Sequence, residues 1–246
     1  MSGHSKWANI KNKKAKTDAA KGKIFTKIGK EIAVAAKGGA DPNLNSKLAD
    51  VIAKAKAANM PNDNIARAIK KAAGEGANVN YETLVYEGYG IGGSAVIVKT
   101  LTDNKNRTVG EVRHYFDKYG GSLGSTGSVS YMFEQKGVIV AERTVDLDED
   151  TMMEIALEAG ADDVLTEDDC YTVYTAPADF SAVRKFLEAK GIKFIEADIE
   201  MVPNDYITLD EKQVETFLKM IDALEENDDV QSIYHNVTLP EEEDEE

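Results

Sequence analysis

Apolar residues in the first third of the chain recur with the period of an α-helix. Over residues 22–36 they fall within an arc of about 100° of a helix, and a pair of glycines ends the pattern. A second stripe starts near Ser46, and a third follows with Asn62 or Asp63 as its N-cap. The pattern predicts a bundle of three short helices. The side of the first helix opposite its apolar stripe carries Lys23, Lys27, Lys30 and Lys37.

After Tyr81 the pattern changes to alternating strands and helices. A β-branched strand is predicted over residues 94–102, a helix over 107–119 and a second strand over 127–133. Near the end of the chain, a helix over 210–226 and a strand over 230–237 can complete the sheet that begins at Ser94.

Between these two parts lies a segment with the order βαββαβ, which is typical of a ferredoxin-like fold. Its predicted elements are strand 137–141, helix 150–159, strands 164–166 and 171–175, helix 180–189 and strand 193–201. The fold class that follows is an α+β multidomain protein: an N-terminal three-helix bundle followed by two α/β (ferredoxin-like) domains, one inserted in the other. The predicted domains are 1–79 (basic arm plus three helices), 80–134 with 204–240 (discontinuous), 135–203 (inserted) and an acidic tail, 241–246.

The formal net charge of −15 is divided very unevenly along the chain. Residues 1–80 hold 16 Lys and Arg against 6 Asp and Glu, a net charge of +10. Residues 81–246 hold 13 against 38, a net charge of −25. Such an asymmetry indicates a basic nucleic-acid-binding region beside an acidic body.

Ten lysines lie within residues 1–40, and the segment 2–22 has almost no apolar periodicity. We expect this segment to be mobile alone and to order on a polyanion, because lysines bind phosphates and release counterions. Trp7 can stack on a base, although packing of Trp7 on the helices, or a purely solubilising tail, explains the same residues. The candidate nucleic-acid-binding residues are Lys6, Trp7, Lys11, Lys13, Lys14, Lys16, Lys21, Lys23, Lys27 and Lys30.

Two further basic clusters allow two interpretations each. On the third helix, Arg67, Lys70 and Lys71 share a face, which fits either a helix-turn-helix or, the interpretation we favour, a solvated surface. The other cluster lies in the acidic body. It fits either a second contact with nucleic acid or, the interpretation we favour, ion pairs with neighbouring acids. That cluster consists of Lys105, Arg107 and Arg113.

No pattern indicates catalysis, so we predict no catalytic residue, no metal, no cofactor and no small-molecule substrate. The glycines at 88, 90 and 93 fit G-x-G-x-x-G, but a strand follows them where a dinucleotide site needs a helix; a tight turn is favoured. The single cysteine, Cys170, is surrounded by acids that raise a thiol pKa. The absence of a long apolar run predicts no membrane partner and a soluble, cytoplasmic protein.

Several segments resemble the YebC/PmpR family, and the resemblance extends over essentially the whole chain. They are GHSKWANIKNKK at 3–14, KGKIFTK at 21–27, YEGYGIGG at 86–93, TDNKNRTVGEVRH at 102–114 and GGSLGSTGSVSYMF at 120–133. The resemblance implies three domains, one inserted in another, and a DNA-binding transcriptional regulator. It also implies an alternative, because a mitochondrial relative activates translation of a cytochrome oxidase subunit and bacterial relatives are linked to ribosomes stalled at proline runs. Asn12 stands where many relatives have His, and Ile91 where many have Pro.

The predicted partner is therefore nucleic acid: DNA, or ribosomal RNA or tRNA, with the ribosome itself as an alternative. A base-specific DNA reader usually presents a rigid element to the major groove, whereas a lysine arm suits the crevices of structured RNA. The usual name of the family favours DNA.

Overall fold

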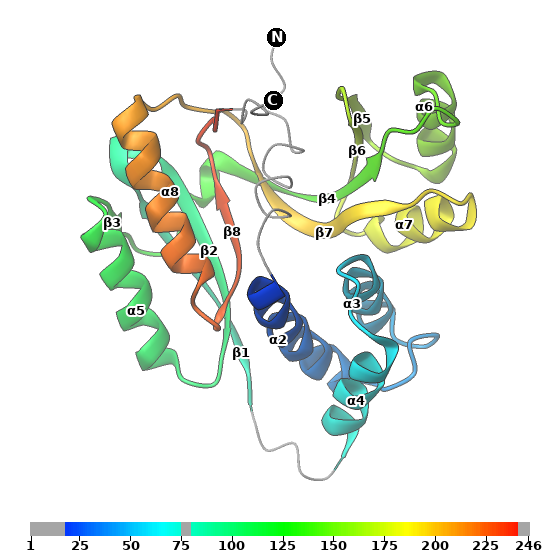
Figure 1. Ribbon diagram of the computed structural model, residues 1–246, viewed down its shortest axis with the longest axis horizontal. Helices are drawn as coiled ribbons and strands as arrows, with labels where there is room; N and C mark the ends of the chain where they lie inside the picture. The colour runs from blue at the N-terminus through cyan, green and yellow to red at the C-terminus, as the bar shows by residue number, and fades with distance from the viewer. Residues whose placement is uncertain (1–17, 75–79, 241–246) are drawn as a thin grey trace.

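The computed structural model of the 246-residue chain describes residues 18–74 and 80–240 (Figure 1). Residues 2–17 of the segment predicted to be mobile and the acidic tail, 241–246, lie outside this range, as do residues 75–79. For residues 18–22 the prediction was wrong, because they form the start of a helix. The rest of the chain forms one helical region and two antiparallel sheets that carry helices.

The helical region contains α2 (Asp18–Ala35), α3 (Ser46–Ala57) and α4 (Asn62–Ala73), which confirms the three predicted helices. Ile28, Ile32 and Leu48 form the centre of a small core whose members all come from these helices and their connections. Asn45 fixes the corner between α2 and α3. Its amide donates to the carbonyls of Ala35 and Gly39 at 2.8 Å each, and its side-chain oxygen accepts from Leu48 N–H at 3.1 Å.

The prediction of Asn62 or Asp63 as the N-cap of the third helix was wrong. The cap position is Pro61, which provides no side-chain hydrogen bond, so the helix starts on the fixed backbone of a proline.

The first sheet has the strand order β3-β1-β2-β8, and all its pairs are antiparallel. It consists of β1 (Glu82–Tyr89), β2 (Ala95–Thr102), β3 (Ser122–Leu123) and β8 (Val230–His235), with α5 (Lys105–Lys118) and α8 (Glu211–Glu225). Both helices pack on the same face, where Phe116 and Phe217 are completely buried (Figure 1). The last helix and strand of the chain therefore complete the sheet begun by β2, as predicted.

The second sheet has the strand order β5-β6-β4-β7, which is the order of a ferredoxin-like fold. Its elements are β4 (Phe133–Glu142), α6 (Glu149–Ala159), β5 (Asp163–Thr166), β6 (Cys170–Thr175), α7 (Phe180–Ala189) and β7 (Phe194–Pro203). Helices α6 and α7 cover one face over Met152, Tyr171 and Leu187, which are fully buried. The whole second sheet, from β4 to β7, lies between β3 and α8 in the sequence, so it is inserted within the chain of the first sheet.

Two details of the first sheet differ from the sequence prediction. Strand β1 was not predicted, and the strand predicted over 127–133 was wrong, because turns and a 3₁₀ segment occupy this stretch and β4 begins only at Phe133. The cause is the buried carboxylate of Glu87, which accepts the backbone N–H groups of Gly127, Val129 and Ser130 at 2.8 to 3.0 Å. These donors bind a side chain and are not available to a neighbouring strand.

The glycine-rich stretch is a turn, as favoured from the sequence. Residues 90–94 connect β1 to β2, and Gly92 and Gly93 have φ of 66° and 78°, a conformation that costs little only for glycine. No helix follows the turn, so the context of a dinucleotide site is missing.

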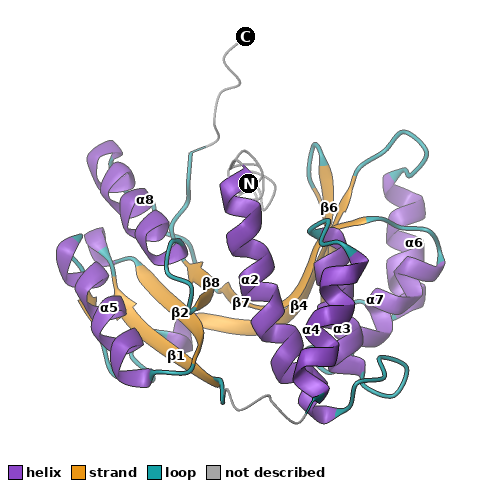
Figure 2. Ribbon diagram, turned by 60° about the horizontal axis from the view of Figure 1, so that its bottom comes forward, coloured by secondary structure: helices purple, strands orange, loops and turns teal. Residues whose placement is uncertain are grey.

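The helical region contacts the second sheet mainly through α3. Arg184 on α7 donates to Asp50 at 3.0 Å, and Ser181 donates to the same carboxylate. One turn further along α3, Lys54 lies 2.6 Å from Asp198 on β7 and 3.0 Å from Glu31 on α2. Burial alone would raise the pKa of Asp198, but Lys54 holds it below its usual value. Figure 2 shows α2, α3 and α4 together, with β1 and β2 of the first sheet on the left and α6 and α7 of the second sheet on the right.

Candidate nucleic-acid interface

The predicted lysines of α2 point at the turn between α8 and β8. Lys23 forms an ion pair with Glu226 at 2.6 Å, and Lys27 donates to the backbone carbonyl of Glu225 at 2.8 Å. One turn further, Lys30 donates to the carbonyl of Asp228 at 2.8 Å and to the carboxylate of Asp229 at 2.9 Å. We call Lys23, Lys27 and Lys30 the lysine face, and residues Glu225, Glu226, Asn227, Asp228 and Asp229 the acidic turn.

Asp229 is the buried centre of this contact, with only 4% of its surface exposed. Besides Lys30, Arg107 donates to its carboxylate at 2.6 Å, and the hydroxyls of Thr102 and Thr108 donate at 3.0 and 2.9 Å. Burial would raise the pKa of Asp229, but Arg107, Lys30 and Thr108 together lower it to about 2. The carboxylate therefore stays ionised at neutral pH.

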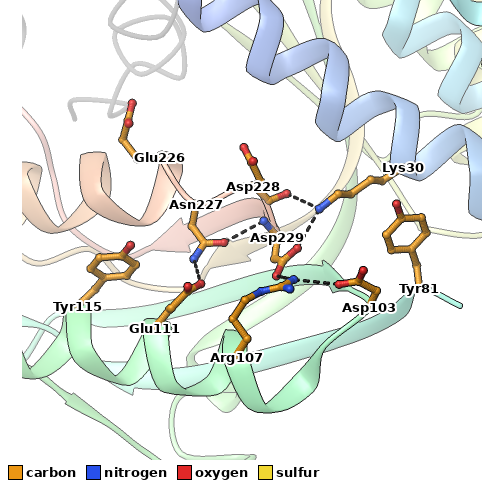
Figure 3. A pocket seen from close by; sticks show the side chains of 10 residues that line it. All are labelled: Lys30, Tyr81, Asp103, Arg107, Glu111, Tyr115, Glu226, Asn227, Asp228 and Asp229. Carbon is orange, nitrogen blue, oxygen red and sulfur yellow. Dashed lines mark hydrogen bonds and ion pairs between the residues drawn. The ribbon is translucent and has the colours of Figure 1, made fainter. Parts of the chain in front are cut away.

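A polar pocket of about 440 Å³ opens beside Asp229 between α2, α5 and the acidic turn (Figure 3). Lys30 reaches into it from α2 and Arg107 from the start of α5, and both point to the same carboxylate (Figure 3). On the α5 side, Asn227 donates to Glu111 at 2.7 Å. The complete lining is Lys30, Tyr81, Asp103, Arg107, Glu111, Tyr115, Glu226, Asn227, Asp228 and Asp229. Five of these side chains are carboxylates, so the pocket has no excess of positive charge that would favour phosphate.

The basic cluster of the acidic body is not a single patch. Arg107 pairs with Asp103 at 2.9 Å as well as with Asp229. Lys105 and Arg113 are exposed, but Arg113 is six residues beyond Arg107 and therefore about 120° away around the helix. The structure brings Arg107 together with Lys30, and leaves the other two residues apart from that site.

A second basic surface lies on α4. Arg67, Lys70 and Lys71 are exposed on the side of the helix opposite Ile65, which is buried in the helical core. Within residues 18–74 and 80–240, no ion pair or hydrogen bond of their side chains is found. We call these three residues the α4 basic face. Nearby, Asn59 has a φ of 58° in the short turn between α3 and α4.

Of the remaining residues predicted to bind nucleic acid, the structure describes only Lys21. Lys21 is exposed on the first turns of α2, and Lys37 donates to Asn80 at 3.2 Å. The rest of the predicted arm lies outside the described residues, namely Lys6, Trp7, Lys11, Lys13, Lys14 and Lys16. For these six, nucleic-acid binding stays a prediction.

The features that could indicate catalysis, metal binding or a membrane span are the cysteine thiol, clusters of ligating side chains and long apolar helices. Burial raises the pKa of the Cys170 thiol to about 12, and its hydrogen bond to Glu167, at 3.0 Å, acts in the same direction. In the described part of the chain, no cluster of His, Cys, Asp and Glu is arranged to hold a metal ion. Of the described helices, none is long and apolar enough to cross a lipid bilayer.

Sequence reasoning missed the acidic turn. The run EENDD at 225–229 overlaps the end of the helix predicted over 210–226, so a concentration of acids is visible in the sequence, but no partner was predicted for it. Nothing in the local sequence pairs this run with lysines 198 to 203 residues earlier.

These features define a class: a multidomain α+β protein in which a basic helical region packs on two acidic α/β units. Residues 5–75 match the model of the TACO1/YebC protein N-terminal domain, and residues 81–237 match that of the TACO1/YebC second and third domain. The chain belongs to the TACO1/YebC family.

Relatives of known sequence and structure agree with this assignment. A probable transcriptional regulatory protein of Acetivibrio thermocellus is 62% identical, over 96% of this chain and 98% of the relative. The probable transcriptional regulatory protein ORF2U of Hathewaya histolytica is 60% identical, over 98% of each chain. The crystal structure of a conserved hypothetical protein, Aq1575, from Aquifex aeolicus matches with a TM-score of 0.83 at 44% identity, over 94% of this chain and 96% of that one.

Proposed function

We propose that this protein is a non-enzymatic regulator of gene expression that binds nucleic acid, and that it acts on DNA as a transcriptional regulator. The observation that carries the proposal is the separation of charge, with a net of +10 on residues 1–80 and −25 on the rest. The relatives named as probable transcriptional regulatory proteins support the choice of DNA.

The contact with phosphates is assigned to two parts of the basic region. The lysines of residues 6–21 supply one part, with Trp7 stacking on a base, and the α4 basic face supplies the other. The acidic α/β units are repelled by the same polyanion and lie away from it. Regulation then follows from occupancy of the nucleic acid, without a chemical step.

The test is a salt titration of binding to a fluorescein-labelled DNA duplex. The variant replaces Lys11, Lys13, Lys14 and Lys16 by Ala, and its matched control replaces Lys185, Lys193, Lys212 and Lys219, which are exposed on the acidic units. We expect the first variant to bind more weakly, with a slope of log K against log salt that is shallower by about 0.7–0.9 per lost contact. The control should keep the wild-type slope. Equal slopes in all three proteins would contradict the assignment.

One observation favours a second candidate, a ribosome- or tRNA-associated translation factor. The outward side of α4 carries long basic side chains next to Ala66 and Ala73, and the contacts that such side chains make with phosphates carry no sequence information. A surface of this kind fits structured RNA as well as DNA. Gradient sedimentation of a cell lysate separates the two: co-migration with ribosomes after DNase treatment supports translation, and sequence-dependent retardation of a promoter fragment without co-migration supports transcription.

A further inference from the structure

The lysine face and the acidic turn meet through charged groups arranged in a row. Three lysines spaced at i, i+4 and i+7 on α2 contact four successive groups: the carbonyl of Glu225, the carboxylate of Glu226, the carbonyl of Asp228 and the carboxylate of Asp229. Lysine ammonium groups bind anionic oxygens as point charges, without the directional demands of arginine. The same three lysines could therefore bind successive backbone phosphates equally well.

The acidic turn also has the electrostatic character of a phosphate backbone. It follows the C-terminus of α8, where the last carbonyls carry the negative end of the helix dipole. Lys27 contacts one of these last carbonyls, and the exposed side chains of Glu226 and Asp228 add full charges. The lysines thus meet both partial and full negative charge over a short distance.

This interface can open without leaving a buried charge unpaired. If Lys30 departs, Asp229 keeps Arg107, Thr102 and Thr108 as donors. The pair Lys23–Glu226 is largely exposed, with 40% and 71% of the side chains accessible, so salt screens it. On a polyanion the released lysines regain anionic partners.

Apolar packing does not oppose the opening. The buried members of the helical core, including Ile28 and Ile32, come from the helical region alone, and the core of the first sheet is a separate cluster. The contacts of α3 with Asp198 and Arg184 lie on the other sheet. They can act as a pivot on which the helical region turns as one body, so that α2 leaves the acidic turn while Ile28, Ile32 and Leu48 stay packed together.

We propose that the acidic turn is an internal phosphate mimic that covers the lysine face and gives it up to nucleic acid. The inference rests on the proposed function and adds its regulation. In the free protein the lysine face is closed and the α4 basic face is open. Binding of a polyanion displaces the turn and extends the contact from α4 to α2. Since only open molecules form the α2 contact, the affinity gained from that contact is scaled by the fraction of molecules that are open.

The experiment holds the interface closed reversibly. Lys23→Cys and Glu226→Cys are combined and joined by a bismaleimide whose spacer is cleaved by reductant. The charged ends of the two replaced side chains, Lys23 Nζ and Glu226 Oε2, lie 2.6 Å apart, so a spacer about as long as the two side chains together can join the shorter cysteines. Cys170 is buried and its pKa is raised to about 12, so it reacts slowly. Wild-type protein treated in the same way controls for reaction there. The probe is a labelled DNA duplex, together with single-stranded RNA of the same sequence.

We expect the cross-linked protein to bind about tenfold more weakly than the same protein after cleavage. Its salt slope should be shallower by about 1.4–1.8, because Lys27 and Lys30 are withheld from phosphates. Equal affinity and slope before and after cleavage would overturn the inference, while leaving nucleic-acid binding by wild-type protein intact. Absence of binding by wild-type protein to either probe would overturn the proposed function itself, and the inference with it.

Discussion

Two basic helix faces lie within the same small helical region, yet their surroundings are opposite. The lysine face of α2 is paired with the acidic turn, while the α4 basic face is exposed to solvent. Both faces have the spacing of a helix and a similar density of charge. The difference comes from residues 225–229, which are far away in the sequence. Basic spacing alone therefore identifies a surface that can bind anions but does not tell whether the protein itself already supplies one.

The largest expected effect concerns the stability of the closed face. Asp229→Ala removes the buried carboxylate that Lys30, Arg107, Thr102 and Thr108 share, and leaves two neighbouring cations without this anion. We expect a loss of about 3–5 kcal/mol in the free energy of unfolding, measured by urea denaturation. Arg67→Ala, on the open face, should stay within about 0.5 kcal/mol of wild type. Similar losses for both variants would remove the distinction between the two faces.

A smaller effect is expected from pH. The pKa of Asp229 is lowered from 3.8 to about 2 in the folded protein, so its ionised form stabilises the fold above pH 3.8. This contribution, about 2 kcal/mol, is lost as the pH falls from 3.8 towards 2, because the unfolded chain takes up the proton first. Asp229→Asn should remove this part of the acid sensitivity in urea titrations at pH 7 and pH 3. The pKa of Glu87 is also lowered, but Glu87 contributes equally to the acid sensitivity of wild type and of Asp229→Asn, so its contribution cancels in the comparison of the two proteins.

Removal of the α4 basic face should reduce the affinity for DNA by a moderate amount. We expect replacement of Arg67, Lys70 and Lys71 by Ala to weaken DNA binding about tenfold and to make the salt slope shallower by about 2–3. Replacement of Lys185, Lys193 and Lys212 by Ala removes the same charge from the acidic units and should change neither quantity. Equal weakening in both triple variants would mean that only the total charge matters.

The smallest expected effect is a gain. Glu226→Gln removes the exposed ion pair with Lys23 and should favour the open form, so that anisotropy titrations show about threefold tighter DNA binding. Glu215→Gln makes the same charge change on α8, where the residue pairs with Lys219 at 2.6 Å, and serves as the control. If both variants gain affinity equally, the gain reflects net charge and not release of the lysine face.

Local patterns in the sequence were sufficient for most elements of the fold. Helix α7 and the hairpin of β5 and β6 lie close to the predicted positions, because apolar periodicity and turn residues determine them locally. Strand β1 was missed, since its glycines and its alternation of burial depend on Phe116 and on the neighbouring strands. The false strand at 127–133 shows the same limit: a carboxylate forty residues earlier decides that backbone.

Of the contact between the lysine face and the acidic turn, only the lysine face could be predicted from the sequence. The spacing of Lys23, Lys27 and Lys30 follows from the helix period, and the structure confirms that they share one face. Their partner could not be predicted, because the pairing exists only after β8 has joined β2. The prediction that Arg107 pairs with acids was correct. One of them, Asp103, is four residues away in the sequence and could be identified there, but the other, Asp229, is 122 residues away and could not.

The position of the acidic turn also has a consequence for protein synthesis. Lys30 is translated 198 residues before Asp228. At about 5–20 residues per second, a nascent chain carries an uncovered lysine face for about 10–40 s beside the RNA that surrounds every ribosome. The lysine face is therefore exposed to an external polyanion before the acidic turn that pairs with it has been synthesised.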